Sequence, residues 1–365
     1  MIMKVLSYFT KIPKKLLLSV ARHKHVEYTS SEYMHTEDSE SLAVWKSLQW
    51  SEEEHDTDGN PLVSVIVPNY NHAAYLRERL DTIYNQTYSN IEVILLDDCS
   101  TDNSCDILME YAEQYADKTR VVFNETNVGH VFRQWNKGLS LAKGELIWIA
   151  ESDDYSDLHF LEEMVKCFRY KSVQLAFARS VFMRGERQIW STEEYLADVR
   201  SLRWDMPFTL TADRAVQLGF GYKNIIPNVS SAVFRHIGEV PEELAAVCKD
   251  MQLSSDWIFY LAIMKKGCLS YTNQTVNYYR VHEESTSLRV QHTLRYYDEY
   301  EMVSRYVAEN YDVEDELFQK VFEYLEYHYM TTQSTLHAEV LQEHYHVSEL
   351  MALRKRRRSE NGLPR

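Results

Sequence analysis

The sequence predicts an α/β protein built on a mostly parallel sheet that is flanked by helices and followed by a helical C-terminal extension. Three short apolar runs rich in β-branched residues, 63–67, 91–96 and 145–150, alternate with helical patterns. Such alternation is typical of neighbouring parallel strands joined by crossover helices. Polar or acidic residues follow each run directly. Because the carboxyl ends of such strands meet at one edge of the sheet, where ligands bind, these residues are expected to converge on one site.

The other elements are predicted from hydrophobic periodicity and from residues that start or stop helices. Asn71 is the expected N-cap of the first helix, and Gly144 is expected to stop the third. From about residue 290 onward the pattern is helical, with apolar and aromatic residues at the spacing of a packing face. The expected helices are 41–48, 73–84, 102–115, 130–142, 158–170, 211–218 and 254–266. The further expected strands are 120–123, 174–183, 228–234 and 268–279.

Composition limits the class of protein. A chain of 365 residues with 45% hydrophobic and 26% charged residues is typical of a soluble globular protein with one large domain. The net charge of −16 argues against a nucleic-acid partner, because that affinity depends on cations. The five cysteines form no CxxC pair and are expected to be reduced thiols in a cytoplasmic protein. No apolar run reaches the about 18 residues that a membrane-spanning helix needs.

Both ends of the chain carry basic segments. Residues 4–25 are basic and amphipathic, which fits an interfacial membrane anchor or an ordinary packed helix. The run 354–358 is expected to be a solvated basic tail, which could also contact anionic lipids. The apolar C-terminal helices could pair in an oligomer. The expected domains are 1–60 (basic segment and polar lead-in), 61–287 (in two halves, 61–155 and 156–287) and 288–365 (helical extension).

Two acidic clusters are the sharpest chemical signals. Asp97 and Asp98 could start a helix, but Ser100, Thr101 and Asp102 already supply caps. The segment 151–154 places three carboxylates within four residues, with no Lys or Arg close by in the sequence. Carboxylates held together repel each other, and Mg²⁺ or Mn²⁺ relieves this while using one or two of them. The alternative is an exposed acidic turn. The sequence therefore predicts a hard cation and a nucleotide diphosphate.

Several ordered motifs resemble family 2 glycosyltransferases of the GT-A (Rossmann-like) fold. They are VSVIVPNYNHAAYL, VILLDDCSTDNS, NVGHVFRQWNKGLSLAKGELIWIAESDD and YYRVHEESTS, which together cover about residues 61–287. The resemblance implies metal-dependent transfer of a sugar, with inversion, from a nucleotide-diphospho-sugar, with UDP favoured. It also implies a glycan or lipid-linked glycan acceptor of bacterial surface polysaccharide or lipopolysaccharide synthesis, at the cytoplasmic face of the membrane.

The same resemblance assigns roles to individual residues. Asp256 is the expected general base, with Asp250 and Glu243 as competitors, although Asp256 could instead cap its helix. Glu151 stands where the family more often has Asp, which leaves its part in metal binding open. The implied nucleotide and substrate residues are Pro68, Tyr70, Asn71, Asp97, Asp98, Asn127, Gly129, Asp153 and Arg280. The implied metal ligands are Asp153, Asp154, Glu151 and His282.

Two other functions are compatible with the same alternation of strands and helices. A sugar-1-phosphate nucleotidyltransferase needs a loop with Gly, Arg and Lys after the first strand, and this chain has PNYNHAAYL there. A non-catalytic module of the same fold that binds a nucleotide sugar or organises an assembly remains the alternative, because of Glu151 and the long helical extension. The sugar, the acceptor and the linkage have no sequence motif.

Overall fold

The structure is a computed structural model of the chain. It divides into two compact units, Met1–Leu48 and Gln49–Arg365. In the first unit the described residues form one helical turn, and all elements named below belong to the second. The expected amphipathic anchor at 4–25 and His282 lie outside the described residues. The residues described are 45–47, 49–51, 60–249, 251–281, 290, 293–332 and 338–360.

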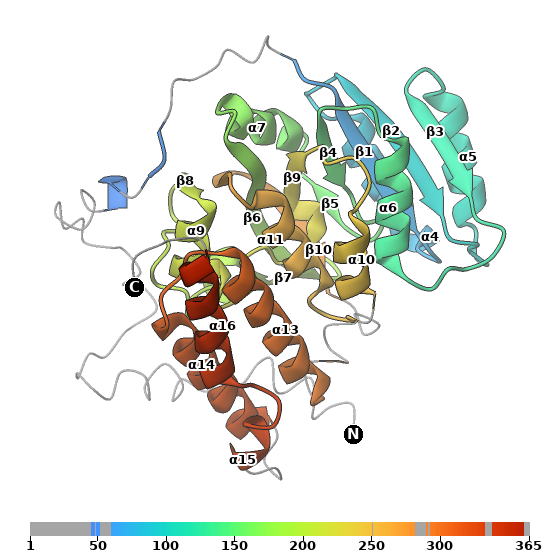
Figure 1. Cartoon of the computed structure of the whole chain (residues 1–365). Coiled ribbons are helices and arrows are strands. Elements are labelled where there is room, and N and C mark those ends of the chain that lie inside the picture. Colours follow the sequence, from blue (N-terminus) through green and yellow to red (C-terminus); the bar gives the residue numbers. More distant parts are fainter. Residues whose placement is uncertain are drawn as a thin grey trace. The chain divides into compact units, whose positions relative to one another are not determined.

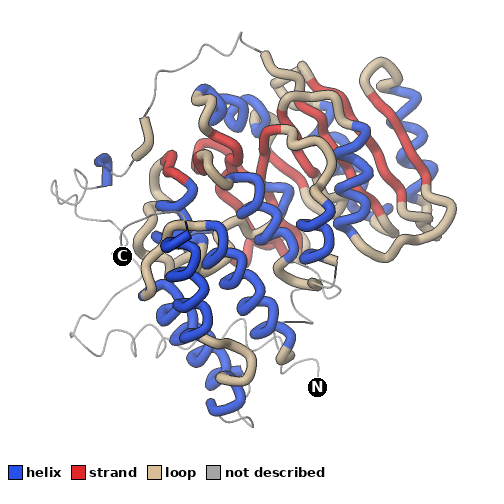
Figure 2. The backbone as a smooth tube through the Cα atoms, viewed as in Figure 1, coloured by secondary structure: helices blue, strands red, loops and turns tan. Residues whose placement is uncertain are grey.

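The second unit contains a ten-stranded mixed sheet. Eight strands follow the order β3-β2-β1-β4-β9-β6-β10-β5, and in addition β7 pairs with β6 and β8 pairs with β10. Strands β1, β2, β3 and β4 run parallel, and so do β6 and β10, whereas β9 is antiparallel to both β4 and β6. Figure 2 shows the strands side by side with helices around them. The predicted fold class is confirmed. The strands are β1 Val63–Asn69, β2 Ile91–Asp97, β3 Thr119–Phe123, β4 Leu146–Ile149, β5 Tyr155–Ser156, β6 Val173–Arg184, β7 Arg187–Ser191, β8 Phe208–Thr211, β9 Ala232–Arg235 and β10 Cys268–Arg280.

The helices fall into a set that covers the sheet and a group formed by α13, α14 and α16 (Figure 1). The region 192–231 contains the strand β8, short helical segments and turns, and the helix expected at 211–218 is found as α9 and the helical turn that follows it. The sheet-covering helices are α4 Ala73–Tyr84, α5 Ser104–Gln114, α6 Val131–Leu141, α7 Phe160–Lys166, α10 Glu242–Cys248 and α11 Ser255–Met264. The others are α8 Thr192–Tyr195, α9 Ala212–Ala215, α13 Arg295–Asn310, α14 Glu316–Thr332, α15 Ala338–Leu341 and α16 Val347–Glu360.

The core lies on both faces of the sheet because the strands are apolar on both sides, as in buried parallel sheets. On one face the ring of Trp148 in β4 stacks on Phe160 of α7 at 4.8 Å between centroids. On the other face Phe259 of α11 makes edge contacts with Phe132 of α6 and Phe234 of β9. Helices α6 and α11 therefore pack together over the strands whose ends form the site.

Asn71 does not cap α4, contrary to the prediction. Its backbone is left-handed (φ 56°), and its side-chain oxygen accepts a hydrogen bond from the Thr101 N–H at 2.7 Å. The first N–H of α4, at Ala73, instead donates to Asp102 Oδ2 at 2.9 Å. The loops after β1 and β2 are thus tied to each other. This contact between distant segments is invisible to a local capping rule.

Gly144 was expected to stop α6, but the helix ends at Leu141 with Ala142 as its cap. The glycine is needed for close approach. A Cβ atom at this position would lie 2.6 Å from both the Leu62 carbonyl oxygen and the Ser64 backbone nitrogen. Backbone atoms cannot move away as a flexible side chain can.

We therefore expect Gly144→Ala to lower the free energy of unfolding by about 2 kcal/mol, because the added Cβ would force β1 and the start of β4 apart. Urea denaturation followed by circular dichroism measures this. Lys143→Ala, at the exposed neighbouring position, is the control and should change stability by less than about 0.5 kcal/mol. Equal effects of the two substitutions would contradict the steric explanation.

The expected solvated tail at 354–358 is instead part of α16. The Arg354 side chain is buried and forms ion pairs with Glu314 and Asp315 at 2.9 Å each. Arg358 pairs with Asp312 at 3.2 Å. These cations hold the loop between α13 and α14. The basic run therefore forms ion pairs within the chain, and we call these contacts of Arg354 and Arg358 the arginine clasp.

The Tyr-rich helices form a packing face, as predicted. Tyr296, Tyr297 and Tyr329 are buried, and the Ser304 hydroxyl hydrogen-bonds the Tyr345 hydroxyl at 2.8 Å. All five cysteines are free thiols, as expected. Among the described residues, no helix is sufficiently long and apolar to cross a membrane. The division at residues 287 and 288 stays a prediction.

Candidate functional site

The carboxyl ends of β1 and β2 are joined through a buried carboxylate. Asn69 and Asp97 are register partners, and the Asn69 amide donates to Asp97 Oδ1 at 2.8 Å. The Ser100 backbone N–H and hydroxyl also donate to Asp97, at 2.8 and 2.6 Å. Asp97 therefore shapes the turn after β2. The structure places it beside the expected nucleotide pocket as a positioning group.

Asp98 organises the loop that follows β3. Its carboxylate accepts hydrogen bonds from the Asn124 amide at 2.7 Å and from the backbone N–H groups of Val128 and Gly129 at 3.0 and 3.3 Å. Gly129 has φ +66°, which favours glycine. Asn127, on the same loop, is exposed. The structure thus brings Gly129 to Asp98, with Asn127 on the same loop, and their role in nucleotide binding stays a prediction.

The end of β1 offers an aromatic surface. Pro68 is buried within the strand, whereas Tyr70 is 44% exposed and Asn71 is exposed beside it. An exposed tyrosine ring at a strand end can stack on a planar base. Pro68 shapes the strand end and leaves any direct contact with a base to Tyr70.

The acidic loop, defined here as Glu151–Asp154, directly follows β4 and is held by several elements. Glu151 Oε1 accepts a hydrogen bond from the Trp135 indole N–H of α6 at 2.8 Å. Asp154, only 1% exposed, accepts from the Asn228 amide at 2.5 Å and from the Arg280 backbone N–H at 3.0 Å. Trp135 is buried, and its ring packs on Phe132 and Phe259.

The acidic loop concentrates negative charge in a poorly solvated place. Burial, together with the charge of Asp153, raises the pKa of Glu151 to about 8. The same two causes raise the pKa of Asp154 to about 7. Both carboxyl groups therefore bind protons more readily than they would in water. A neighbouring cation would stabilise their charged forms and so lower both pKa values.

Two arginines lie at the acidic loop, so the expectation that no cation is near was wrong. The Arg280 side chain donates to the Asp153 carbonyl oxygen at 2.7 Å and forms an ion pair with Glu78. Its guanidinium lies 4.5 Å from the centroid of the Tyr155 ring. The second arginine, Arg79 of α4, is fully buried. Both come from segments far from the loop in sequence, which is why local composition gave no sign of them.

The residues fit a hard divalent cation held by few protein ligands. Within the described part of the chain, no three His, Cys, Asp or Glu side chains converge as a metal-binding group. Asp154 already bonds Asn228 and Arg280, which makes it a positioning residue, whereas the partly exposed Asp153 and Glu151 are oxygen donors at the strand end. Mg²⁺ and Mn²⁺ sites with one or two carboxylates plus phosphate oxygens are common, so this donor set suffices.

Asp256 lies in the first turn of α11. It accepts hydrogen bonds from the Asn224 amide at 3.2 Å and from the Trp257 N–H at 2.7 Å, and burial raises its pKa to about 7. Burial, then the charges of Asp256 and Glu151, raises the pKa of Tyr260 well above its usual value.

The start of α11 is not capped by Asp256 alone. Glu299 of α13 accepts hydrogen bonds from the N–H groups of Gln252, Leu253 and Ser254, at 2.8, 2.9 and 2.8 Å. Of the competitors for the base, Glu243 is exposed on α10, and Asp250 lies outside the described residues.

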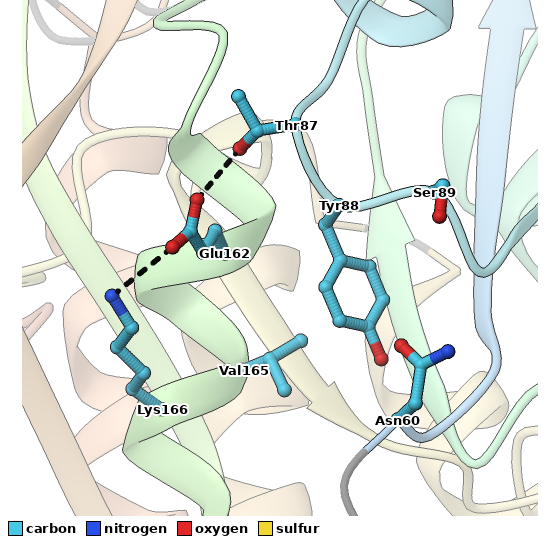
Figure 3. A pocket seen from close by; sticks show the side chains of 7 residues that line it. All are labelled: Asn60, Thr87, Tyr88, Ser89, Glu162, Val165 and Lys166. Carbon is cyan, nitrogen blue, oxygen red and sulfur yellow. Dashed lines mark hydrogen bonds and ion pairs between the residues drawn. The ribbon is translucent and has the colours of Figure 1, made fainter.

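A hollow of about 460 Å³ lies elsewhere, before β2 and beside α7 (Figure 3). In it Glu162 hydrogen-bonds Thr87 and pairs with Lys166. Because Thr87 precedes β2, this hollow is at the amino ends of the strands, away from the acidic loop. Its lining residues are Asn60, Thr87, Tyr88, Ser89, Glu162, Val165 and Lys166.

Sequence reasoning missed Arg79, Trp135, Asn224, Asn228 and Glu299. For Arg79 a signal was present: it lies on the face of α4 that carries Leu76, Leu80 and Ile83, at three- and four-residue spacing. A charged residue on an apolar face indicates a buried role. For the others, the hydrogen-bond partner lies 16 to 74 residues away in the sequence, and no local pattern reports it.

Residues 64–223 match the family model described as Glycosyl transferase family 2. The glycosyltransferase GlyG of Streptococcus pneumoniae is 42% identical over 113 residues, which cover 31% of this chain and 35% of that protein. TuaG of Bacillus subtilis, a relative named for teichuronic acid biosynthesis, is 35% identical over 121 residues, 33% of this chain and 47% of that protein. The chain thus spans a third to a half of the length of these relatives.

Solved structures share the fold. The complex of S. aureus TarS residues 1–349 with UDP-GlcNAc has a TM-score of 0.53 at 20% identity, covering 75% of this chain and 74% of that chain. The mannosyltransferase PcManGT from Pyrobaculum calidifontis, in complex with GDP-Man and Mn²⁺, has a TM-score of 0.51 at 18% identity and covers 88% and 82%. At such identities the likeness shows the fold, which is GT-A-like, as the sequence motifs predicted.

Proposed function

We propose that this chain is a family 2 glycosyltransferase that transfers a sugar, with inversion, from a nucleotide-diphospho-sugar to an acceptor hydroxyl. The carrying observation is the acidic loop at the carboxyl end of β4, a strand that pairs in parallel with β1. There the Arg280 side chain of β10 donates a hydrogen bond to the Asp153 carbonyl oxygen. The match of residues 64–223 to the family model supports the same reading.

In this proposal the nucleotide lies across the ends of β1 and β2. The exposed ring of Tyr70 stacks on the base, and the loop that Asp98 holds through Val128 and Gly129 contacts the base or ribose. We favour UDP, as the sequence motifs suggest, and the UDP-GlcNAc complex of TarS supports that choice. Asp97 holds the turn after β2 in place through its hydrogen bonds with Asn69 and Ser100.

The diphosphate lies over the acidic loop in this arrangement. Asp153 and Glu151 would hold a divalent cation there, while Asp154 fixes the loop against Asn228 and the backbone of Arg280. A bound Mn²⁺ or Mg²⁺ would supply Lewis-acid stabilisation of the charge on the leaving diphosphate. The guanidinium of Arg280, fixed by the Asp153 carbonyl oxygen, adds a second positive charge on that side.

The acceptor is activated from the side of α11. Its hydroxyl gives its proton to the Asp256 carboxylate while its oxygen forms a bond to the anomeric carbon of the donor. The bond from that carbon to the diphosphate oxygen breaks with its electron pair, so the negative charge leaves on the nucleoside diphosphate. Attack opposite to the leaving group inverts the configuration. A base with a pKa near 7 suits this step at neutral pH.

We further propose that the acceptor is a glycan or lipid-linked glycan of bacterial surface polysaccharide or lipopolysaccharide synthesis, used at the cytoplasmic face of the membrane. The relationship to TuaG, named for teichuronic acid biosynthesis, supports this acceptor class. Peripheral contact through residues 4–25 and pairing of C-terminal helices stay predictions.

The test is calorimetric binding of UDP, GDP, dTDP and CDP, with and without Mn²⁺, combined with a donor hydrolysis assay. We expect one nucleotide to bind best, and Asp153→Ala to weaken its Mn²⁺-dependent binding by about tenfold or more. Glu186→Gln, in the exposed turn between β6 and β7, is the control and should bind as the original chain does.

The outcomes separate the candidate functions. Nucleotide binding with donor hydrolysis supports the transferase. Binding of nucleotide sugars without hydrolysis or transfer to any glycan would support the non-catalytic module instead. No binding of any of the four nucleotides by the folded protein would overturn both.

A further inference from the structure

Arg79 is the most unusual charged residue in the second unit. It lies on α4 with its side chain fully buried, among the apolar residues Leu76, Leu80 and Ile83 of the same helix. Its guanidinium lies 4.8 Å from the centroid of the Trp148 ring in β4. Trp148 precedes the acidic loop by three residues, so the buried cation lies just beneath the loop's strand.

The guanidinium has an unusual hydrogen-bond environment. Among the described residues, no acceptor bonds its Nε, Nη1 or Nη2. Burying an arginine in this way is costly unless other charges compensate, and the contact with the Trp148 ring recovers only about 2 kcal/mol. Other charges must therefore offset this cost.

The compensating charges are those of the acidic loop. Burial lowers the pKa of Arg79 to about 10, and the charges of Asp154, Asp153 and Glu151 oppose this effect, in that order. Arg79 therefore stays cationic at neutral pH. The carboxylates act on it through space, since none of them hydrogen-bonds it. Among the described residues, Arg280 also contacts this loop through the Asp153 carbonyl oxygen, and its positive charge adds to the lowering of the Arg79 pKa.

We infer that Arg79 is a fixed counter-cation of the acidic loop, a positioning residue that offsets the loop's charge before any divalent cation or donor binds. The purpose of this arrangement rests on the proposed function. A loop that a buried cation already holds in place does not have to reorganise when the diphosphate binds. It also implies that Arg79 and a divalent cation compete electrostatically for the same carboxylates.

The first test needs no ligand. In EDTA at about pH 9, above the pKa of Glu151, we compare the unfolding constants of Arg79→Met, Glu151→Gln and the double variant. Gln can still accept the Trp135 N–H bond. We expect Arg79→Met to raise the unfolding constant about tenfold less in the Glu151→Gln background than in the original chain. Strictly additive effects would show that Arg79 serves packing alone and would overturn the inference.

The second test measures Mg²⁺ affinity at about pH 9 by calorimetry in the absence of nucleotide. Removing a positive charge near the loop should tighten Mg²⁺ binding, by about tenfold for Arg79→Met, whereas Arg79→Lys keeps the charge and should match the original chain. A merely structural arginine predicts the opposite sign, because a distorted loop binds the cation less well. Unchanged or weaker Mg²⁺ binding by folded Arg79→Met would therefore overturn the inference.

These readouts are independent of the proposed activity. If the protein bound no nucleotide, the charge coupling between Arg79 and Glu151 could still be measured. If the coupling were absent while Asp153 remained essential for nucleotide binding, the transferase proposal would stand without the counter-cation.

Discussion

Replacing Asp256 with Asn is expected to lower the rate of sugar transfer by about 100- to 10,000-fold, the usual contribution of a general base. Asn has nearly the same shape and can still accept the Trp257 N–H bond, but it cannot take the acceptor proton. Because Asp256 belongs to α11 and not to the ends of β1 and β2, the dissociation constant of the nucleotide should stay within about threefold. Single-turnover transfer and calorimetry measure the two quantities.

The pH dependence of the original chain provides a second readout of the same residue. The pKa of Asp256 is raised to about 7 by burial, so kcat/KM should rise with pH and level off above that value. The raised pKa also means that the folded state binds this proton more tightly than the unfolded state. Its contribution to stability is therefore present at acidic pH and is lost as pH rises through 7. Asp256→Asn should be at least as stable as the original chain above neutral pH.

Glu243→Gln is the matched control for this prediction. Glu243 is the exposed carboxylate of α10 that competes with Asp256 on sequence grounds. Its replacement should leave both the rate and the pH profile unchanged. A large loss of rate in Glu243→Gln, with little loss in Asp256→Asn, would show that our proposal places the base on the wrong helix.

Replacing Glu299 with Ala is expected to lower the free energy of unfolding by about 3 kcal/mol and to lower the rate of transfer as well. Glu299 is 2% exposed, and its carboxylate accepts three consecutive backbone N–H groups before α11. Its loss leaves those donors and the neighbouring Arg295 side chain without their acceptor. The first turn of α11, which carries Asp256, should then shift.

Chemical denaturation and transfer assays measure both effects. Glu299→Gln keeps one acceptor oxygen and should lie between the original chain and Glu299→Ala in stability. Glu309→Ala, at an exposed position of the same helix, should change neither quantity. If Glu299→Ala unfolded like the original chain, the carboxylate would not be holding the start of α11.

Much of the sheet and its helices could be predicted because the relevant information is local. The helix expected at 73–84 is found at those residues, and the strands expected at 120–123 and 268–279 begin or end within one residue of the prediction. Continuous β-branched runs and three- and four-residue periodicity report which side of an element is buried. The three clusters at the strand ends follow directly from the parallel order of β1, β2 and β4.

The surroundings of the site could not be predicted, because they depend on which side chains meet across the fold. Trp135 reaches Glu151 only because α6 packs beside the end of β4, and Asn228 reaches Asp154 from an irregular turn. The region 184–228 contains short strands and turns whose residues follow no period. The role of Gly144 was predicted wrongly for a similar reason. A Cβ atom at this position would meet backbone atoms of Ser64 in β1 and of Leu62, the residue before β1.

The arginine clasp of α16 has a consequence for the order in which the protein matures. Arg305 of α13 pairs with Glu349 of α16 at 2.8 Å, and the Tyr345 hydroxyl bonds Ser304 of the same helix. Through Glu299, α13 in turn fixes the start of the helix that carries Asp256. On the ribosome, the strands of the donor half emerge long before α16 does. In the proposed function, the helix contacts that fix the base at Asp256 are therefore completed only after α16 has been synthesised.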